Sequence, residues 1–203
     1  PIAAYLSALR SVVAGEDHTV RITLREARHG AVVSLDGQWD LPLQPGEAHE
    51  LVADAEFDSM VFEGLTGVTR AMHMCRGNAP GGMWAATGGY EAISKDVFPR
   101  LTNLDRLLLE YDSDRAGTFE PLGDVLPSHE VVLGLVTTKT GRRETVDGLA
   151  ARTREAARFL PLDRLALSPQ CGFATSILGN ALTVDDERAK LATIVETARA
   201  VWE

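Results

Sequence analysis

Four residues that could bind a metal lie at or just beyond the ends of expected strands. His73 and Cys75 stand two apart on a strand predicted over 69–75, so their side chains leave the same face. Glu110 ends a second strand, and Cys171 follows a third. In a parallel α/β barrel the carboxyl ends of the strands meet at one mouth, so these side chains can form a tetrahedral site. Sulfur-rich ligation of this kind favours zinc.

Spacing alone leaves another interpretation open. The four residues come from distant parts of the chain, without the compact spacing of a zinc finger. Buried cysteines also act as small hydrophobic residues, and His73 could be a hydrogen-bonded core residue. The metal site therefore depends on a fold that brings the strand ends together.

The elements that would position these residues alternate between strands and helices. The patterns predict strands over 19–24, 31–35, 58–62, 69–75, 104–111, 131–137 and 163–168, and helices over 3–13, 47–55, 90–101, 119–125, 144–160 and 184–202. Apolar strands separated by helices indicate a parallel sheet covered on both faces. The fold class is α/β, with a TIM-type (β/α)8 barrel as the first expectation and an open doubly wound sheet as the second. The chain lacks the G-x-G-x-x-G fingerprint of a dinucleotide-binding sheet.

Composition narrows the classes of function. The 203 residues include 20 Lys and Arg against 29 Asp and Glu, and the net charge of −9 argues against nucleic-acid binding. No apolar run approaches the length that spans a bilayer. Two cysteines are too few for a disulfide framework and favour a reducing compartment, so we expect a cytoplasmic protein. Residue 1 is Pro, and a (β/α)8 barrel typically needs about 250 residues. We therefore expect a shortened barrel or a fragment of a longer one.

Three motifs carry a resemblance to a known family. The segment from His73 to Asn78 (H-M-C-R-G-N) resembles the H-x-C motif of the cobalamin-independent methionine synthases. Glu110 stands where that family has its glutamate, and the segment from Ser168 to Phe173 (S-P-Q-C-G-F) resembles its P-x-C-G motif. The resemblance covers residues 66–203 well and 1–65 poorly. It implies a single catalytic barrel domain over 1–203, with a zinc ion bound by His73, Cys75, Glu110 and Cys171.

The resemblance also implies an activity. It predicts a zinc-dependent methyltransferase that transfers a methyl group to a small thiol, with homocysteine expected as substrate and methionine as product. A zinc-bound thiolate would be the nucleophile, and a folate or a corrinoid would be the methyl donor. Members of the short C-R-G-N branch include thiol transferases that open epoxides with coenzyme M, so that activity is an alternative. A non-catalytic zinc-binding barrel fragment is another, and a metal-dependent decarboxylase or lyase is a third. A homo-oligomer is compatible with all of these.

Further residues are candidates for substrate binding. Gln38-Trp39-Asp40-Leu41-Pro42 resembles the family's Q-x-D-E-P strand, which implies that Asp40 holds the amino group of the thiol substrate, although a solvated loop aspartate is an alternative. Arg76 and Asn78 could bind a carboxylate or sulfonate, or order their loop. Lys139 at a strand end could bind an anion. The family's D-x-H-S-P-R motif is missing, so the proton donor is expected to differ.

Overall fold

The computed structural model of this chain describes residues 9–14, 20–24, 55–75, 88–174 and 180–203. The chain divides into two compact units, Pro1–Gly37 and Gln38–Glu203, and each is described by itself. In the first unit, β1 (Leu9–Ala14) and β2 (Val20–Leu24) pair in antiparallel fashion. The strand predicted over 19–24 is thereby confirmed. The strand predicted over 31–35 lies outside the described residues.

Two predictions near the start of the chain are wrong. The helix predicted over 3–13 is a strand from Leu9 onward, because Val12 pairs with Ile22 across the hairpin and local periodicity does not report that partner. The strand predicted over 58–62 is helical through residue 60. The less exposed positions Ala55, Ser59 and Phe62 follow helical spacing, which a five-residue window could not reveal. The helix predicted over 47–55 lies outside the described residues except for its last position.

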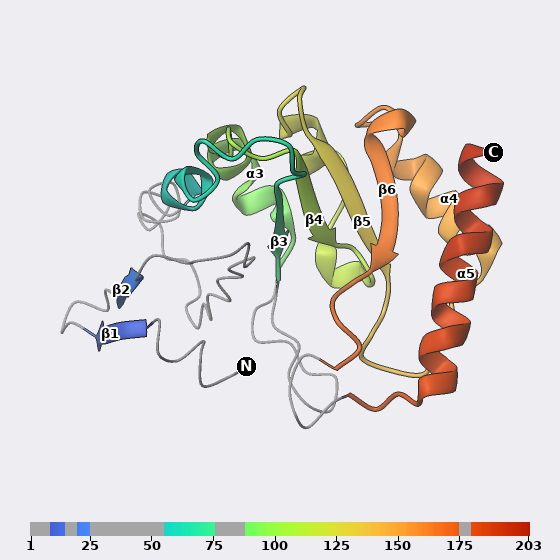
Figure 1. Cartoon of the computed structure of the whole chain (residues 1–203). Helices are drawn as coiled ribbons and strands as arrows, with labels where there is room; N and C mark the ends of the chain where they lie inside the picture. Colours follow the sequence, from blue (N-terminus) through green and yellow to red (C-terminus); the bar gives the residue numbers. More distant parts are fainter. Residues whose placement is uncertain (1–8, 15–19, 25–54, 76–87, 175–179) are drawn as a thin grey trace. The chain divides into compact units, whose positions relative to one another are not determined.

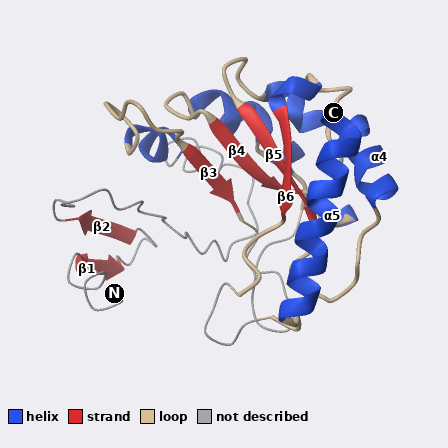
Figure 2. Ribbon diagram, turned by 45° about the vertical axis from the view of Figure 1, so that its right-hand side comes forward, coloured by secondary structure: helices blue, strands red, loops and turns tan. Residues whose placement is uncertain are grey.

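The second unit is built on a four-stranded sheet with the order β3-β4-β5-β6. The strands are β3 (Ala71–Met74), β4 (Arg106–Glu110), β5 (Glu130–Val136) and β6 (Leu165–Pro169), and every neighbouring pair is parallel. Figure 2 shows their arrowheads at the same edge of the sheet. All four confirm predicted strands. Since their carboxyl ends share one edge, residues there can meet although they are far apart in sequence.

Helical segments connect the strands. Between β3 and β4 lie η2 (Tyr90–Ala92), α3 (Ser94–Val97) and η3 (Phe98–Arg100); η4 (Asp114–Ala116) and η5 (Glu120–Asp124) lie between β4 and β5; α4 (Val146–Ala156) and η6 (Leu162–Arg164) lie between β5 and β6; and α5 (Val184–Trp202) closes the chain. The single helix predicted over 90–101 is therefore three short turns. α5 has the predicted bounds and begins with a capping box between Thr183 and Asp186. It packs against α4 and β6 (Figure 1).

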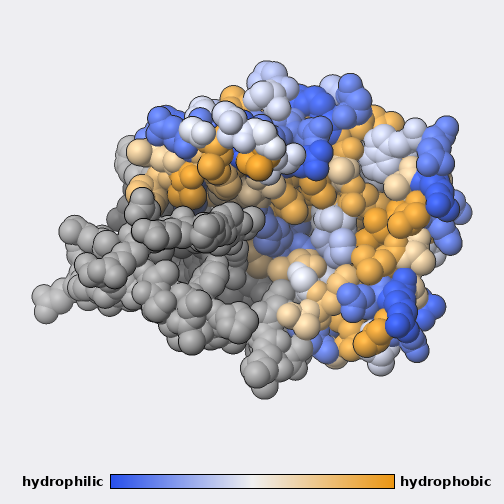
Figure 3. Space-filling model, viewed as in Figure 1, coloured by the Kyte–Doolittle hydropathy of each residue, from blue (hydrophilic) through white to orange (hydrophobic). Residues whose placement is uncertain are grey.

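The two faces of the sheet differ. One face forms the core, where apolar side chains of the central strands are almost completely buried: Leu107, Leu109, Val131 and Leu133. The other face carries a row of register neighbours that keep some exposure: His73, Leu108, Val132 and Ala166. In the view of Figure 3, hydrophobic surface runs across the middle of the molecule and hydrophilic residues gather along its upper and right-hand edges. The candidate metal ligands lie at the end of the less buried face.

The four described strands of the second unit form a parallel sheet in which the strands follow one another in sequence order. This is the order of neighbouring strands in a β/α barrel, whereas an open doubly wound sheet reverses its order at a switch point. The α/β class is confirmed, but four parallel strands are described rather than eight, so closure into a barrel stays a prediction. None of the helices among the described residues has the length and apolarity to cross a membrane.

Candidate metal centre

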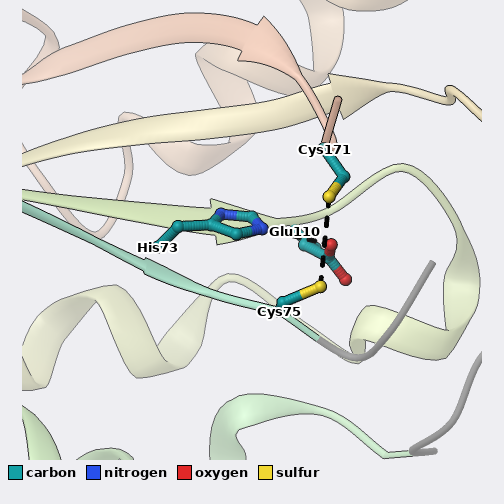
Figure 4. Close-up of side chains that lie close together, drawn as sticks. All are labelled: His73, Cys75, Glu110 and Cys171. Atoms are coloured by element: carbon teal, nitrogen blue, oxygen red, sulfur yellow. Dashed lines mark hydrogen bonds and ion pairs between the residues drawn. The ribbon is translucent and has the colours of Figure 1, made fainter. Parts of the chain in front are cut away.

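Four side chains converge at the carboxyl edge of the sheet. His73 comes from β3, Cys75 follows that strand directly, Glu110 is the last residue of β4, and Cys171 lies just beyond β6. Each offers one ligand atom, and these atoms all lie within 4.8 Å of one another. Figure 4 shows the four side chains pointing toward a common centre. The structure thus brings together all four residues that the motifs singled out.

Two distances between ligand atoms are close to those of a tetrahedral zinc site. Two sulfurs bound at about 2.3 Å to one tetrahedral metal lie about 3.8 Å apart. The sulfurs of Cys75 and Cys171 are 4.0 Å apart, and neither cysteine is part of a disulfide. A nitrogen and an oxygen bound at about 2.0–2.2 Å lie about 3.4 Å apart, and His73 Nε2 is 3.5 Å from Glu110 Oε1. The donor set and these two distances therefore fit zinc, and all four ligand atoms lie within 4.8 Å of one another.

Glycine at one position allows Cys171 to reach the centre. Gly134 of β5 lies between Glu110 of β4 and Ser168 of β6 in register. A Cβ atom at Gly134 would lie 2.8 Å from the Cα atom of Gln170. Since real Cβ atoms essentially never come that close to another atom, only glycine lets the chain leaving β6 cross so near to β5.

Tyr90 ties the ends of β3 and β4 together. Its hydroxyl accepts a hydrogen bond from the backbone N–H of Glu110 at 2.8 Å and donates one to the carbonyl oxygen of Met74 at 3.2 Å. Tyr90 is buried, so these bonds are shielded from water. Its hydroxyl therefore fixes the distance between the strand that carries His73 and the residue that offers the carboxylate.

The carboxylate of Glu110 is completely buried and held by an amide. Its Oε1 accepts a hydrogen bond from Nε2 of Gln170 at 2.8 Å. The Oε1 atom of Gln170 in turn accepts from the hydroxyl of Thr138 at 2.9 Å. The sequence pattern assigned no role to Gln170, Thr138 or Gly134. The one available signal was the place of Gln170 beside Cys171 within the P-x-C-G segment.

The site favours an ionised thiol beside a protonated imidazole. Burial acts to lower the pKa of His73, but hydrogen bonds with Cys171 and Glu110 outweigh it and raise the pKa to about 9. A hydrogen bond with Cys75 lowers the pKa of Cys171 to about 5 against the effect of burial, and His73 contributes in the same direction. A thiolate is the form that binds metals and attacks electrophiles. The cysteine is thus prepared for metal binding.

A second charged pair lies near the centre, at the ends of β4 and β5. Lys139 is 2% exposed, and burial lowers its pKa, although the nearby carboxylates of Glu110 and Asp112 oppose the shift. Burial raises the pKa of Asp112. Zinc with two thiolates and one carboxylate would carry one excess negative charge, which the cation of Lys139 can offset. That Lys139 binds an anion of the substrate stays a prediction.

A pocket of about 290 Å³ opens beside the four side chains. Its lining joins the less buried face of the sheet to the segment after β6: His73, Leu108, Leu109, Ser168, Pro169, Gln170, Cys171 and Gly172. This volume is at the lower end of the range of small-molecule sites. The pocket therefore suits a small substrate that reaches His73 and Cys171 past an apolar wall.

Three predicted substrate-binding residues cannot be placed. Asp40, Arg76 and Asn78 all lie outside the described residues. Their roles stay predictions.

Comparisons with known proteins agree with the motifs. Residues 90–200 match the family described as cobalamin-independent synthase, catalytic domain. The Bacillus subtilis (strain 168) protein YxjG is 46% identical over 160 residues, which cover 78% of this chain and 42% of YxjG. The 5-methyltetrahydropteroyltriglutamate–homocysteine methyltransferase of Nitratidesulfovibrio vulgaris (strain Hildenborough) is 32% identical over 110 residues, which cover 52% of this chain and 13% of that protein.

A solved structure shows the same fold. A B12-independent methionine synthase from Shewanella sp. W3-18-1, in complex with selenomethionine, aligns with a TM-score of 0.57 and 24% identity over 76% of this chain and 44% of that one. The chain spans less than half the length of these relatives. The family match covers more than half of this chain, and so the chain belongs to the cobalamin-independent synthase catalytic-domain family.

Proposed function

We propose that this chain carries a zinc site for transfer of a methyl group to a small thiol, with homocysteine as the thiol. The observation that carries the proposal is the convergence of two thiols, an imidazole and a carboxylate whose ligand atoms lie within 4.8 Å of one another. Membership of the family supports the same reaction class.

In this proposal His73, Cys75, Glu110 and Cys171 hold the zinc ion. When bound, zinc lowers the pKa of a thiol that coordinates it, which makes the thiol a nucleophile at neutral pH. The substrate thiol loses its proton, its sulfur forms a bond to the methyl carbon, and the donor leaves with the electron pair of the broken bond. The residues of the chain must bind the thiol, keep water away and balance the charge.

The chemistry of the four side chains supports different roles for the thiolates and the carboxylate. Cys75 and Cys171 would be the strong thiolate ligands of the ion, and Glu110 would be the weaker ligand, with which an incoming thiol would compete. The apolar side chain of Leu108 in the lining of the pocket limits the access of water. Lys139 offsets negative charge at the buried side of the site.

The experiment that tests the proposal combines metal analysis with a methylation assay. We expect about one zinc per chain and methylation of homocysteine when methyl-folate or methylcobalamin is supplied, each in a separate arm. Cys171→Ser should lose both the metal and the activity. The matched control is Thr153→Val, which removes one buried hydrogen bond in α4, away from the site, and should retain both. Methylation by a folded, zinc-free preparation would overturn the proposal.

A non-catalytic zinc-binding module is the second candidate. It is favoured by the absence of the D-x-H-S-P-R motif from this sequence, because the resemblance implies that the histidine of that motif is the proton donor. A module whose zinc is structural should unfold when the metal is removed, whereas a catalytic site should lose activity with its fold retained. A thermal melt with and without chelator, run beside the methylation assay, separates the two.

A further inference from the structure

Gln170 is buried between a candidate metal ligand and a hydroxyl group. The side chain is 1% exposed, and both ends of its amide form hydrogen bonds. Nε2 donates to Oε1 of Glu110 at 2.8 Å, and Oε1 accepts from the hydroxyl of Thr138 at 2.9 Å. Glu110 and Thr138 are both completely buried, so these bonds do not exchange readily with water.

The chemistry of the partners allows only one orientation of the Gln170 amide. A carboxylate accepts hydrogen bonds and cannot donate them, so the NH₂ end of the amide must face Glu110. With the amide turned over, two oxygens would face each other across 2.8 Å. The Thr138 hydroxyl can donate to the remaining carbonyl oxygen. The backbone of Thr138 is held in turn, because its carbonyl oxygen accepts a hydrogen bond from Nδ2 of Asn180 at 2.9 Å.

The backbone of Gln170 is also fixed. Its N–H donates to the carbonyl oxygen of Val136 at 2.8 Å, which continues the pairing of β6 with β5 beyond the end of the strand. Its Cα atom lies directly against Gly134, where no Cβ atom would fit. The amide is therefore presented to Glu110 from a rigid position, and the next residue along the chain is Cys171.

We propose that Gln170 is a positioning residue for the metal site, which holds the carboxylate of Glu110 toward the ion through an amide oriented by Thr138. Two successive residues then serve one centre, since Cys171 binds the metal and Gln170 orients a ligand that comes from another strand. The inference rests on the proposed function, because it takes Glu110 to be a metal ligand. Partners that orient metal ligands change metal affinity or activity by about 10–100-fold when they are removed.

The test measures the binding of cobalt(II) to the full chain by competition with a coloured chelator, together with the visible absorption spectrum of the bound cobalt. Gln170→Met keeps the length of the side chain and removes both hydrogen bonds, and it should weaken binding about 10–100-fold. Thr138→Val removes only the orienting hydroxyl and should weaken binding about threefold or more, with a shifted cobalt spectrum. Thr138→Ser keeps the hydroxyl and should restore both the affinity and the spectrum.

Thr153→Val is the matched control, because it also replaces a buried threonine that forms one hydrogen bond, to Leu149 in α4. Melting of the metal-free variants shows whether a weaker affinity reflects a damaged fold. The inference is overturned if Gln170→Met and Thr138→Val bind cobalt with the wild-type affinity and spectrum. It is also overturned if Thr153→Val reduces the affinity as much as Thr138→Val does.

Cobalt binding by a ligand variant distinguishes a failure of the positioning role of Gln170 from a failure of the metal site itself. Cys75→Ser removes a candidate ligand itself, so it must reduce cobalt binding if the centre is a metal site. Wild-type binding by Cys75→Ser would refute the metal site and the inference with it. Loss of binding in Cys75→Ser with wild-type binding in Gln170→Met would refute only the positioning role.

Discussion

Replacing Gly134 by alanine should damage the fold and the metal site together. The added Cβ atom would lie 2.8 Å from the Cα atom of Gln170, 3.0 Å from the carbonyl oxygen of Leu109 and 3.2 Å from that of Pro169. All three are backbone atoms, so no side chain can rotate out of the way. Carbon atoms pack at about 3.5 Å or more, and the segment after β6 must therefore move by about 0.7 Å.

This displacement determines two expected magnitudes. Overpacking of a buried site costs about 1–3 kcal/mol, so the free energy of unfolding of Gly134→Ala should fall by that amount. Metal–ligand distances tolerate only about 0.2 Å, and Cys171 moves with its neighbour Gln170. The zinc affinity should therefore fall by at least about tenfold, which corresponds to about 1.4 kcal/mol.

Urea denaturation of the metal-free protein measures the free energy of unfolding, and chelator competition measures the zinc affinity. Gly123→Ala is the matched control, because a Cβ atom there would meet nothing within 4 Å. Its free energy of unfolding should stay within about 0.5 kcal/mol of the wild type. If Gly134→Ala had wild-type stability and zinc affinity, the proposed close crossing of β5 and the segment after β6 would be refuted.

Three further predictions follow from the contacts. Tyr90→Phe leaves the buried N–H of Glu110 without its hydroxyl partner and should lower the free energy of unfolding by about 1–3 kcal/mol in urea; an unchanged midpoint would contradict this role. In the metal-free protein the thiol of Cys171, with its pKa lowered to about 5, should react with iodoacetamide at pH 6 nearly as fast as at pH 8, as measured by mass spectrometry. His73→Ala should shift this reactivity to higher pH, and a profile that rises only above pH 8 in the wild type would be evidence against the thiolate. Lys190→Met removes the buried ammonium group that lies 3.0 Å from the carboxylate of Glu144, so the free energy of unfolding should fall by about 3 kcal/mol in thermal and urea unfolding. An unchanged free energy of unfolding would mean that water reaches the carboxylate of Glu144.

The pattern of apolar residues in the sequence was sufficient to predict where several strands and the last helix lie. The strands β4 and β5 lie where their apolar runs placed them, because both are buried in the sheet. The helix α5 has the predicted bounds, but Leu191 and Val195 of its expected apolar face are exposed, and its buried residues are Lys190 and Thr197. The helix expected over 3–13 failed, since a two-stranded pairing determines the conformation from Leu9 onward. Local patterns do not report such partners.

The sequence by itself determined which residues could serve the site. It contains the imidazole, the two thiols and the carboxylate, at strand ends and in the order of a known family. Only the tertiary structure decided that their ligand atoms lie within 4.8 Å of one another, and that Gln170 faces Glu110. These contacts depend on the register of parallel strands and on the close approach at Gly134. Register and close approach are properties of pairing between distant segments, so spacing along the chain could not supply them.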